Sequence, residues 1–425
     1  MRVIIAAGGT GGHLYPGVAL AREFARLEPG SETIFVGTVR GLETKVVPRE
    51  GFELITITAQ GVMGRGVWGA VQGLAAVPVG LLQCLAICRR RRPDLAIGLG
   101  GYTSPPLVLA AFLLGVKRAI LEPNVHPGVA NRVLSPFANL VFVSFADTAP
   151  FFAPGKTRVV GTPIRQEFLA PQTETRSGEG KRGYTLLVLG GSQGARSVNR
   201  AMVAALPRLL SAHPTLRVIH QTGERDYGEV VAAYRESGWQ VGTGGAPAGG
   251  APSRGMEVVP FLFDVPRAFR QADLIVSRSG ATTVAEITAC GKPALLIPFP
   301  HAIHGHQERN ARILEQAGAA TVILDAGLTG EALAAAITAL LANPGRLGEM
   351  GRCSKALGRA DSAERIVMAC RALVGAGGAS AGPPPGGMGA GGARGPVAPS
   401  NATGGGPPPG GMGAGGAPAG GAPSR

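Results

Sequence analysis

The sequence has few cysteines, and their spacing matches no metal or disulfide motif. Its five cysteines are scattered, no two of them have the CxxC spacing, and their number is odd (Cys84, Cys88, Cys290, Cys353 and Cys370). A disulfide framework or a zinc ribbon is therefore not expected. We expect reduced, mostly buried thiols in a cytosolic protein.

Two common nucleotide-binding motifs are also missing. After Gly9 or Gly11 the dinucleotide fingerprint lacks its third glycine, and the strand that should end in an acid ends in Gly37-Thr38. Gly155-Lys156-Thr157 suggests a P-loop, but Pro150 occupies a position where that motif requires glycine. These departures disfavour a dehydrogenase and a P-loop nucleotide hydrolase.

The sequence likewise gives no metal-binding signature. No Asp-x-Asp pair occurs, so the acidic pair that would hold a metal on a nucleotide diphosphate is absent. The spacing within His301–His306 fits no common zinc pattern, and no cysteine or acid lies beside it. We expect neither a bound metal nor a cofactor.

Acidic residues are few compared with basic ones. The net charge of +14 suggests an anionic partner, and a general bias towards arginine explains it equally well. The local run Arg89–Arg92 has no aromatic residues interleaved with it, so nucleic acid is not expected. Arg2-Val3-Ile4-Ile5 leads directly into a glycine turn, and no signal peptide is expected.

Short apolar segments alternate with helical patterns along the chain, and two halves begin in the same way. Predicted strands at 2–5 and 185–189 each lead into a glycine-rich turn, Gly8–Gly12 and Gly190–Gly194, and then a helix. Such turns let backbone N–H groups approach an anion, and the helix adds its positive N-terminal end. The pattern predicts an α/β protein with two doubly wound parallel sheets.

The long apolar span Val67–Cys88 needs its own interpretation. It has the length of a membrane span but contains Gln72, Gln83 and Pro78, and it stands where a crossover helix is needed. A surface helix against anionic lipid and a buried helix with a solvated basic end fit the residues equally well.

Composition also suggests domain boundaries. We predict an N-terminal domain at 1–163, a C-terminal domain at 164–345, helices at 346–374 that pack back on the first domain, and a tail at 375–425. The string GGAPAGGAPSR occurs at 244–254 and again at 415–425. Such segments have few side chains to offset the cost of ordering, so a loop insertion at 242–255 and the tail are predicted to be disordered.

Seven ordered blocks together resemble the MurG family of bacterial N-acetylglucosaminyltransferases over residues 1–372. The matching residues are Gly8–His13 with Pro16-Gly17; Gly100-Gly101-Tyr102 with Ser104; Glu122 and Asn124 with Pro127-Gly128; Gly161, Pro163 and Arg165; Gly190–Ala195; Arg278–Ala281 with Thr283-Val284 and Glu286; and His306-Gln307 with Asn310-Ala311.

This resemblance implies a GT-B fold, in which two Rossmann-like domains enclose a cleft. It also implies an inverting, metal-independent transfer of N-acetylglucosamine from UDP-N-acetylglucosamine (UDP-GlcNAc) to lipid I, the undecaprenyl-diphosphate-MurNAc-pentapeptide. The product would be lipid II of peptidoglycan biosynthesis, made by a peripheral protein at the cytoplasmic face of the cell membrane. The alternative is a related GT-B enzyme with another lipid or small-molecule acceptor.

The resemblance also implies roles for individual residues. His13 is the expected base, since an imidazole titrating near neutrality suits that proton transfer, or it only positions phosphate. Glu122 would share or take the basic role, and Glu286 would accept both ribose hydroxyls, although alone it would pass for a solvated helix residue. The implied donor-binding residues are Thr10, Gly11, Gly12, Asn124, Arg165, Ser192, Leu262, Ala281, Thr282, Thr283, Val284, Ala285, Glu286 and Gln307.

Two residues depart from the family pattern near the acceptor. Pro123 stands where the family usually has glutamine, and Pro105 where it has glycine. The acceptor-side assignments therefore carry less weight than the donor-side ones. The family's membrane association favours the surface interpretation of the apolar helix with Arg89–Arg92.

Overall fold

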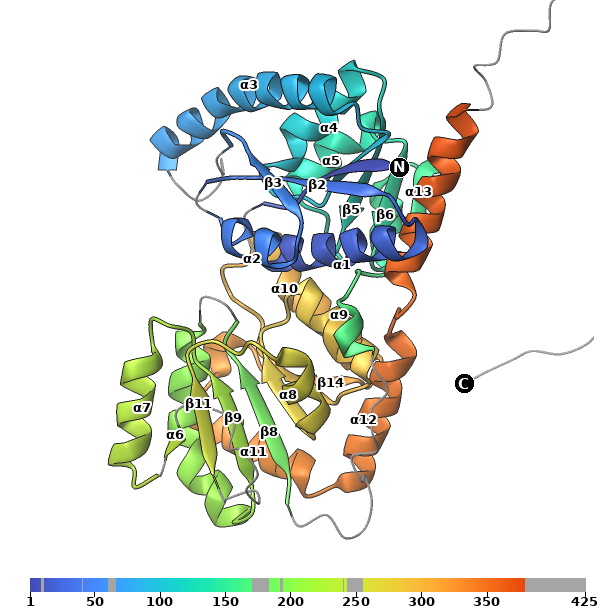
Figure 1. Ribbon diagram of the computed structural model, residues 1–425. Coiled ribbons are helices and arrows are strands. Elements are labelled where there is room, and N and C mark those ends of the chain that lie inside the picture. The colour runs from blue at the N-terminus through green and yellow to red at the C-terminus, as the bar shows by residue number, and fades with distance from the viewer. Residues whose placement is uncertain are drawn as a thin grey trace, which may run out of the picture. The chain divides into compact units, whose positions relative to one another are not determined.

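Two seven-stranded parallel sheets form the framework of the protein (Figure 1). The computed structural model describes residues 1–8, 11–39, 41–59, 66–169, 183–191, 194–239, 241–242 and 255–378, without side chains at 66–76, 303 and 376–378. The predicted loop insertion and tail lie almost entirely outside these residues. The exceptions are Gly242, which is in a strand, Gly255, which precedes the next strand, and the end of the last helix, which continues to Gly378.

The first sheet and its helices form the N-lobe. Its strands are β1 (Arg2–Ala6), β2 (Glu32–Gly37), β3 (Glu53–Thr56), β4 (Leu95–Gly98), β5 (Lys117–Glu122), β6 (Leu140–Val143) and β7 (Thr157–Val159). They lie in the order β3-β2-β1-β4-β5-β6-β7, with Ile5 between Phe35 and Ile97. The helices are α1 (Gly11–Leu27), α2 (Glu43–Arg49), α3 (Gly66–Arg91), α4 (Ser104–Leu113) and α5 (Val129–Leu134).

The second sheet and its helices form the C-lobe, which nearly repeats this order. Its strands are β8 (Thr185–Leu189), β9 (Arg217–Gln221), β10 (Val241–Gly242), β11 (Met256–Val259), β12 (Leu274–Ser277), β13 (Ala294–Leu296) and β14 (Ala320–Val322), in the order β10-β11-β9-β8-β12-β13-β14. The helices are α6 (Arg196–Ala212), α7 (Tyr227–Glu236), α8 (Val265–Gln271), α9 (Ala281–Cys290), α10 (His306–Gln316), α11 (Gly330–Leu341) and α12 (Pro344–Leu357). The predicted pair of doubly wound parallel sheets is confirmed.

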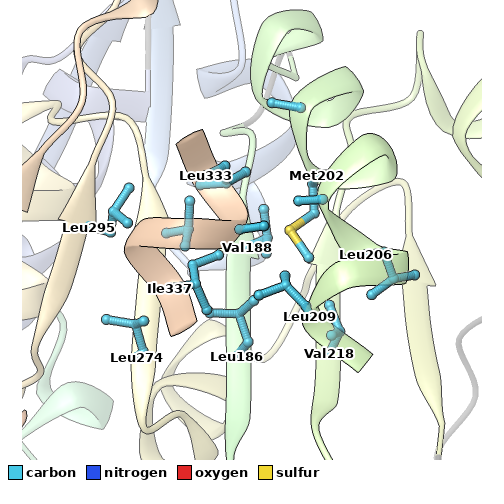
Figure 2. Packing of buried hydrophobic residues seen from close by; sticks show 14 of the residues in the cluster. Leu186, Val188, Met202, Leu206, Leu209, Val218, Leu274, Leu295, Leu333 and Ile337 are labelled. Carbon is cyan, nitrogen blue, oxygen red and sulfur yellow. The ribbon is translucent and has the colours of Figure 1, made fainter. Parts of the chain in front are cut away.

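Apolar side chains from strands and helices form the C-lobe core (Figure 2). Leu186 and Val188 of β8 contribute to the same buried cluster as Met202 of α6 and Ile337 of α11. Burying one such leucine or isoleucine stabilises the fold by roughly 1.5–3 kcal/mol. This core holds the α6 helix on its sheet and so fixes where its N-terminus points.

The last two helices pack on different lobes. Helix α12 contacts α9 of the C-lobe, whereas α13 (Ser362–Gly378) contacts α1 of the N-lobe (Figure 1). Ile366, Val367 and Cys370 of α13 are fully buried in the N-lobe core. The end of the chain therefore completes the core of the lobe in which the chain begins.

In both sheets the chain reverses its winding direction next to the first strand. In the N-lobe this switch lies between β1 and β4, and in the C-lobe between β8 and β12. Parallel α/β sheets bind ligands in the crevice at such switch points, beyond the carboxyl ends of the strands. Both predicted glycine turns, after β1 and after β8, lie at these points.

Candidate active site

One cleft of about 2160 Å³ is lined by residues from both lobes. Its walls include Gly11, Gly12 and His13 of the N-lobe, and Gly191, Gly280 and Thr282 of the C-lobe. Typical small-ligand pockets measure about 300–1,000 Å³. The cleft is therefore large enough for a nucleotide sugar together with part of a second substrate.

The first glycine turn places His13 against a second pair of glycines. Gly100 and Gly101 have φ angles of +92° and +69°, in the left-handed region that favours glycine. A Cβ atom at Gly100 would lie 3.1 Å from the Nε2 atom of His13. The glycine pair thus lets the backbone after β4 lie directly against the imidazole.

The environment of His13 differs from the one predicted from the sequence. Burial, followed by the positive charge of His306, lowers the pKa of His13 to about 4. The imidazole therefore does not titrate near neutrality as expected, because its charged form is poorly solvated in this position. At pH 7 the ring is neutral and able to accept a proton.

The second glycine turn is held by the neighbouring strand. The N–H of Gly190 donates to the carbonyl oxygen of Gln221, whose own Nε2 donates to the carbonyl oxygen of Gly191. A Cβ atom at Gly194 would lie 2.5 Å from the carbonyl oxygen of Thr222, so this position requires glycine. Helix α6 follows at once, and its N-terminal residues line the cleft.

Arg165 and Glu286 form an ion pair inside the cleft. The Nη2 atom of Arg165 lies 3.6 Å from the Oε1 atom of Glu286, and both side chains are largely buried. Burial raises the pKa of Glu286 to about 7, and Arg165 opposes that shift. The carboxyl group of Glu286 therefore changes charge near physiological pH.

Aromatic rings hold the Arg165 guanidinium in place. Its Cζ atom lies 4.6 Å from the ring centroid of Tyr15 in α1 and 5.1 Å from that of Phe168. Its Nε atom is buried and has no hydrogen-bond partner among the described residues. The guanidinium is thus fixed by ring contacts while a donor remains for a bound group.

Three side chains join the two lobes across the cleft. The Thr282 hydroxyl donates to the carbonyl oxygen of Gly12 over 3.0 Å. Asn310 of α10 accepts from the N–H of Val125 over 3.1 Å, and its Nδ2 lies 3.3 Å from the Oδ1 of Asn124. These bonds place the start of α9 opposite the first glycine turn.

Glu122 lies behind the cleft wall. It is 2% exposed, and its carboxylate accepts four hydrogen bonds from the N–H and Nδ2 of Asn124, the N–H of Gly128 and the Nδ2 of Asn131. Burial raises its pKa, while these hydrogen bonds oppose the rise. Because both oxygens are occupied, the geometry favours a role in shaping the 122–131 loop over the expected role as a base.

Gln307 lines the cleft and makes two hydrogen bonds there. Its Oε1 accepts from the N–H of Phe299, and its carbonyl oxygen accepts from the Ser279 hydroxyl over 2.8 Å. Leu262 lies among the cleft residues between β11 and α8. Both side chains border the open space.

The structure brings most of the predicted site residues to the cleft. The ones that line it are Gly11, Gly12, His13, Asn124, Arg165, Leu262, Ala281, Thr282, Thr283, Glu286 and Gln307. Val284 is buried in the C-lobe core, and Ala285 packs against that core. Thr10 and Ser192 lie outside the described residues.

Sequence reasoning did not assign Tyr15 or Arg278 to the site, although both line the cleft. The Arg278 guanidinium donates to the carbonyl oxygens of Ile297 and Pro298, to Asp325 over 2.6 Å and to Ser197 over 2.8 Å. Its position directly after β12 was the available signal. Arg278 ties the first turn of α6 to the loop that follows β13.

No group of three or more His, Cys, Asp and Glu side chains is arranged to hold a metal ion in the part of the chain that the structure describes. His301, His304 and His306 border the cleft. Arg165, Arg196 and Arg278 also line the cleft, and the N-terminal ends of α6 and α9 add partial positive charge.

Two family domains match the chain in order. The glycosyltransferase family 28 N-terminal domain matches residues 3–143, and the family 28 C-terminal domain matches residues 185–366. Together they cover every strand of the two sheets except β7.

Curated relatives match nearly their whole length. A UDP-N-acetylglucosamine–N-acetylmuramyl-(pentapeptide) pyrophosphoryl-undecaprenol N-acetylglucosamine transferase of Geobacter sulfurreducens is 43% identical over 368 residues, which cover 86% of this chain and 97% of the relative. The protein of the same name from Syntrophus aciditrophicus is 44% identical, with 88% and 99% covered.

Two solved structures have a fold similar to that of this chain. The crystal structure of Acinetobacter baumannii MurG superposes with a TM-score of 0.68 at 28% identity, covering 87% of this chain and 99% of that one. The S. aureus MnaA–UDP co-structure has a TM-score of 0.60 at 15% identity, covering 88% and 97%, and shares the fold alone.

Proposed function

Because the chain belongs to glycosyltransferase family 28, we propose that it transfers N-acetylglucosamine from UDP-GlcNAc to lipid I and so forms lipid II of peptidoglycan. The observation that carries this proposal is the cleft lined by both lobes, with the Arg165–Glu286 pair in its wall. A glycosyltransferase needs one site for a nucleotide diphosphate and an adjacent site for an acceptor hydroxyl. The cleft has room and suitable groups for both.

The C-lobe supplies the donor-binding groups in this proposal. Arg165, together with the N-terminal ends of α6 and α9, neutralises the diphosphate, because backbone N–H groups and the helix dipole favour an anion there. Ser192 joins them after the second glycine turn. Leu262 and the first turn of α9 contact the uracil, where Val284 and Ala285 contribute backbone groups.

The ribose and sugar contacts follow from the same arrangement. Glu286 exchanges its contact with Arg165 for the two ribose hydroxyls, which a carboxylate accepts bidentately. Gln307 and Asn124 bind hydroxyls of the transferred sugar from opposite lobes. Thr10, Gly11 and Gly12 approach the donor from the N-lobe side.

His13 is the proposed general base. Its ring is neutral at pH 7 and takes the proton of the attacking acceptor hydroxyl as the glycosidic bond forms, although its lowered pKa makes it a weaker base than a histidine that titrates near neutrality. Direct attack by that hydroxyl displaces UDP and inverts the anomeric carbon. The alternative is that His13 positions phosphate, and the variants described in the Discussion separate the two roles.

We also propose that the N-lobe docks on the cytoplasmic face of the bacterial cell membrane. Within the described residues, no helix has the length and apolar character that crossing a bilayer requires. Leu82 of α3 and Leu113 of α4 are 67% and 62% exposed, and these two helices pack together (Figure 1). Arg89 and Arg90 are exposed at the end of α3. Apolar side chains next to arginines suit an anionic leaflet.

Incubation with labelled UDP-GlcNAc and two acceptors tests the proposed reaction. We expect label in the lipid-linked muramyl-pentapeptide and none in a diacylglycerol. Labelling of the glycerolipid alone would favour the related glycosyltransferase that acts on another lipid.

Calorimetry tests the mode of donor binding. The arginine and helix ends predict that UDP-GlcNAc binds without added divalent cation. Binding that requires magnesium would contradict this part of the proposal.

A further inference from the structure

Five of the chain's seven histidines border the cleft. They are His13, His126, His301, His304 and His306. The proposed reaction uses only His13. The remaining histidines therefore call for a separate explanation, and two of them face each other from opposite lobes.

His126 and His304 form this cross-lobe pair. His126 lies between β5 and α5 of the N-lobe, and His304 lies between β13 and α10 of the C-lobe. Their ring centroids are 5.3 Å apart, with an interplanar angle of 37°. His304 has a φ angle of +52°, a conformation that is costly for a residue other than glycine and is concentrated at functional sites.

Two arginines add charge to the pair. Burial and then the positive charges of Arg309, His304 and Arg132 lower the pKa of His126. Arg132 and Arg309 are both exposed. We call His126, Arg132, His304 and Arg309 the cross-lobe cationic cluster.

Nothing acidic balances this cluster in the part of the chain that is described. Neither Arg132 nor Arg309 forms an ion pair there. The nearby Glu122 has both oxygens in hydrogen bonds, and Glu308 pairs with Arg312. Arg132 and Arg309 carry the positive charge of the cluster, and imidazole rings can donate N–H groups, so an anion between these residues would gain both charge attraction and hydrogen bonds.

Apolar side chains border the cluster on one side. Val129 and Val133 flank Arg132 on α5, are 45% and 61% exposed, and line the cleft. A ligand that fits both features has an anionic group joined to a hydrocarbon chain. A nucleotide sugar has no such chain, whereas a pyrophosphoryl-undecaprenol acceptor has both parts.

We propose that the cross-lobe cationic cluster binds the diphosphate of the lipid-linked acceptor, whose hydrocarbon chain leaves along Val129 and Val133. This inference rests on the proposed function. Since the cluster combines residues of both lobes, the acceptor diphosphate bridges them. The sugar attached to that diphosphate then extends towards His13.

Steady-state kinetics of the full-length protein with Arg132→Gln, Arg309→Gln and the double variant test the proposal. Each single substitution should raise the KM for the lipid-linked acceptor about 10-fold, as expected for a charge-assisted contact to phosphate. The kcat and the KM for UDP-GlcNAc should change less than about twofold, because the donor groups are untouched. Arg346→Gln, at an exposed arginine of α12, is the matched control.

Two results would overturn this site. The first is an unchanged acceptor KM in the double variant. The second is a rise in the donor KM equal to that in the acceptor KM, which would place the arginines in the donor site. Arg132→Lys should recover part of the loss, because it keeps the charge without the planar guanidinium. A thermal scan in which each variant unfolds at the same temperature as the parent would verify that the fold is intact.

Acceptor analogues identify the anionic group. The parent should prefer a diphosphate-linked acceptor to a monophosphate-linked one, and the double variant should lose most of this preference. A different result would be that the double variant no longer distinguishes an acceptor that bears the pentapeptide from one without it. In that case the cluster would bind a peptide carboxylate, and the proposal would be wrong. A parent protein that labels no lipid-linked acceptor would contradict the proposed function itself, before any variant is compared.

Discussion

The two lobes share a strand order, yet they bring different chemistry to the cleft. The turn after β1 places a titratable side chain, His13, against Gly100 and Gly101. The turn after β8 is held by backbone and amide contacts from Gln221. The C-lobe places its acid, Glu286, one turn into α9, facing Arg165. The same strand order, present in both lobes, thus keeps the proposed base apart from the proposed donor-binding charges.

Substitution of His13 should have the largest effect of the changes considered. It should lower kcat without weakening donor binding. His13→Ala should lower kcat about 10²–10⁴-fold, the usual range for losing a general base. Donor affinity measured by calorimetry should stay close to that of the parent, because the donor charges lie in the C-lobe. A variant that turns over as fast as the parent would remove His13 from the base role, and a lost donor affinity with unchanged kcat would indicate phosphate positioning.

Substitution of Glu286 is the corresponding change in the C-lobe. Glu286→Gln should weaken UDP-GlcNAc binding about 50-fold, because the carboxylate contacts to the ribose hydroxyls are lost. Since the pKa of Glu286 is raised to about 7, the parent's donor affinity should fall as the pH drops from 8 to 6 and the carboxylate is protonated. The Gln variant should show little of this dependence. An identical pH profile in both proteins would contradict the assignment.

Substitution of Glu122 tests whether this acid takes part in proton transfer or only supports the fold. The Glu122 carboxylate accepts four hydrogen bonds, two at each oxygen. In Glu122→Gln one oxygen is replaced by an amide NH₂ group, which cannot accept, so this variant should lose about 2 kcal/mol of stability. We expect a lower unfolding temperature in a thermal scan. If kcat fell 100-fold with no change in unfolding temperature, Glu122 would belong to the proton transfer after all.

The smallest effect concerns the outer surface of the N-lobe. Arg89→Gln and Arg90→Gln should each weaken flotation with anionic vesicles about fivefold, the contribution expected of one arginine near such a surface. Arg91 is a poor test position because it pairs with Glu53. Arg346→Gln in the C-lobe serves as the control. Binding that is unaffected by the Arg89 and Arg90 substitutions would contradict the docking surface.

The sequence predicted the architecture well because local patterns encode it. Apolar β-branched segments such as Arg2–Ala6 and Thr185–Leu189 are buried parallel strands, as their composition indicates. The short strand β14 was not predicted, since three residues of ordinary composition give too weak a periodic signal. The family and the transfer reaction, expected from ordered motifs, agree with the matches to family 28 and its curated members.

Side-chain environments were harder to predict from sequence. His13 was expected to titrate near neutrality, and its burial among Gly100, Gly101 and His306 moves its pKa to about 4. Glu122 was expected at the reacting centre, and it lies under the 122–131 loop. Sequence reasoning assigned Tyr15 no role, whereas the structure places its ring centroid 4.6 Å from the Cζ atom of Arg165.

The order of residues by itself determined the two parallel sheets, the glycine turns at their switch points and the family. They could be predicted because strand periodicity, turn composition and ordered motifs are patterns of residues that are close along the chain. Only the tertiary structure decided which charges meet, as with Arg165 and Glu286, or His126 and His304. The partners of each pair lie more than a hundred residues apart, and burial at these positions raises the pKa of Glu286 and lowers that of His126.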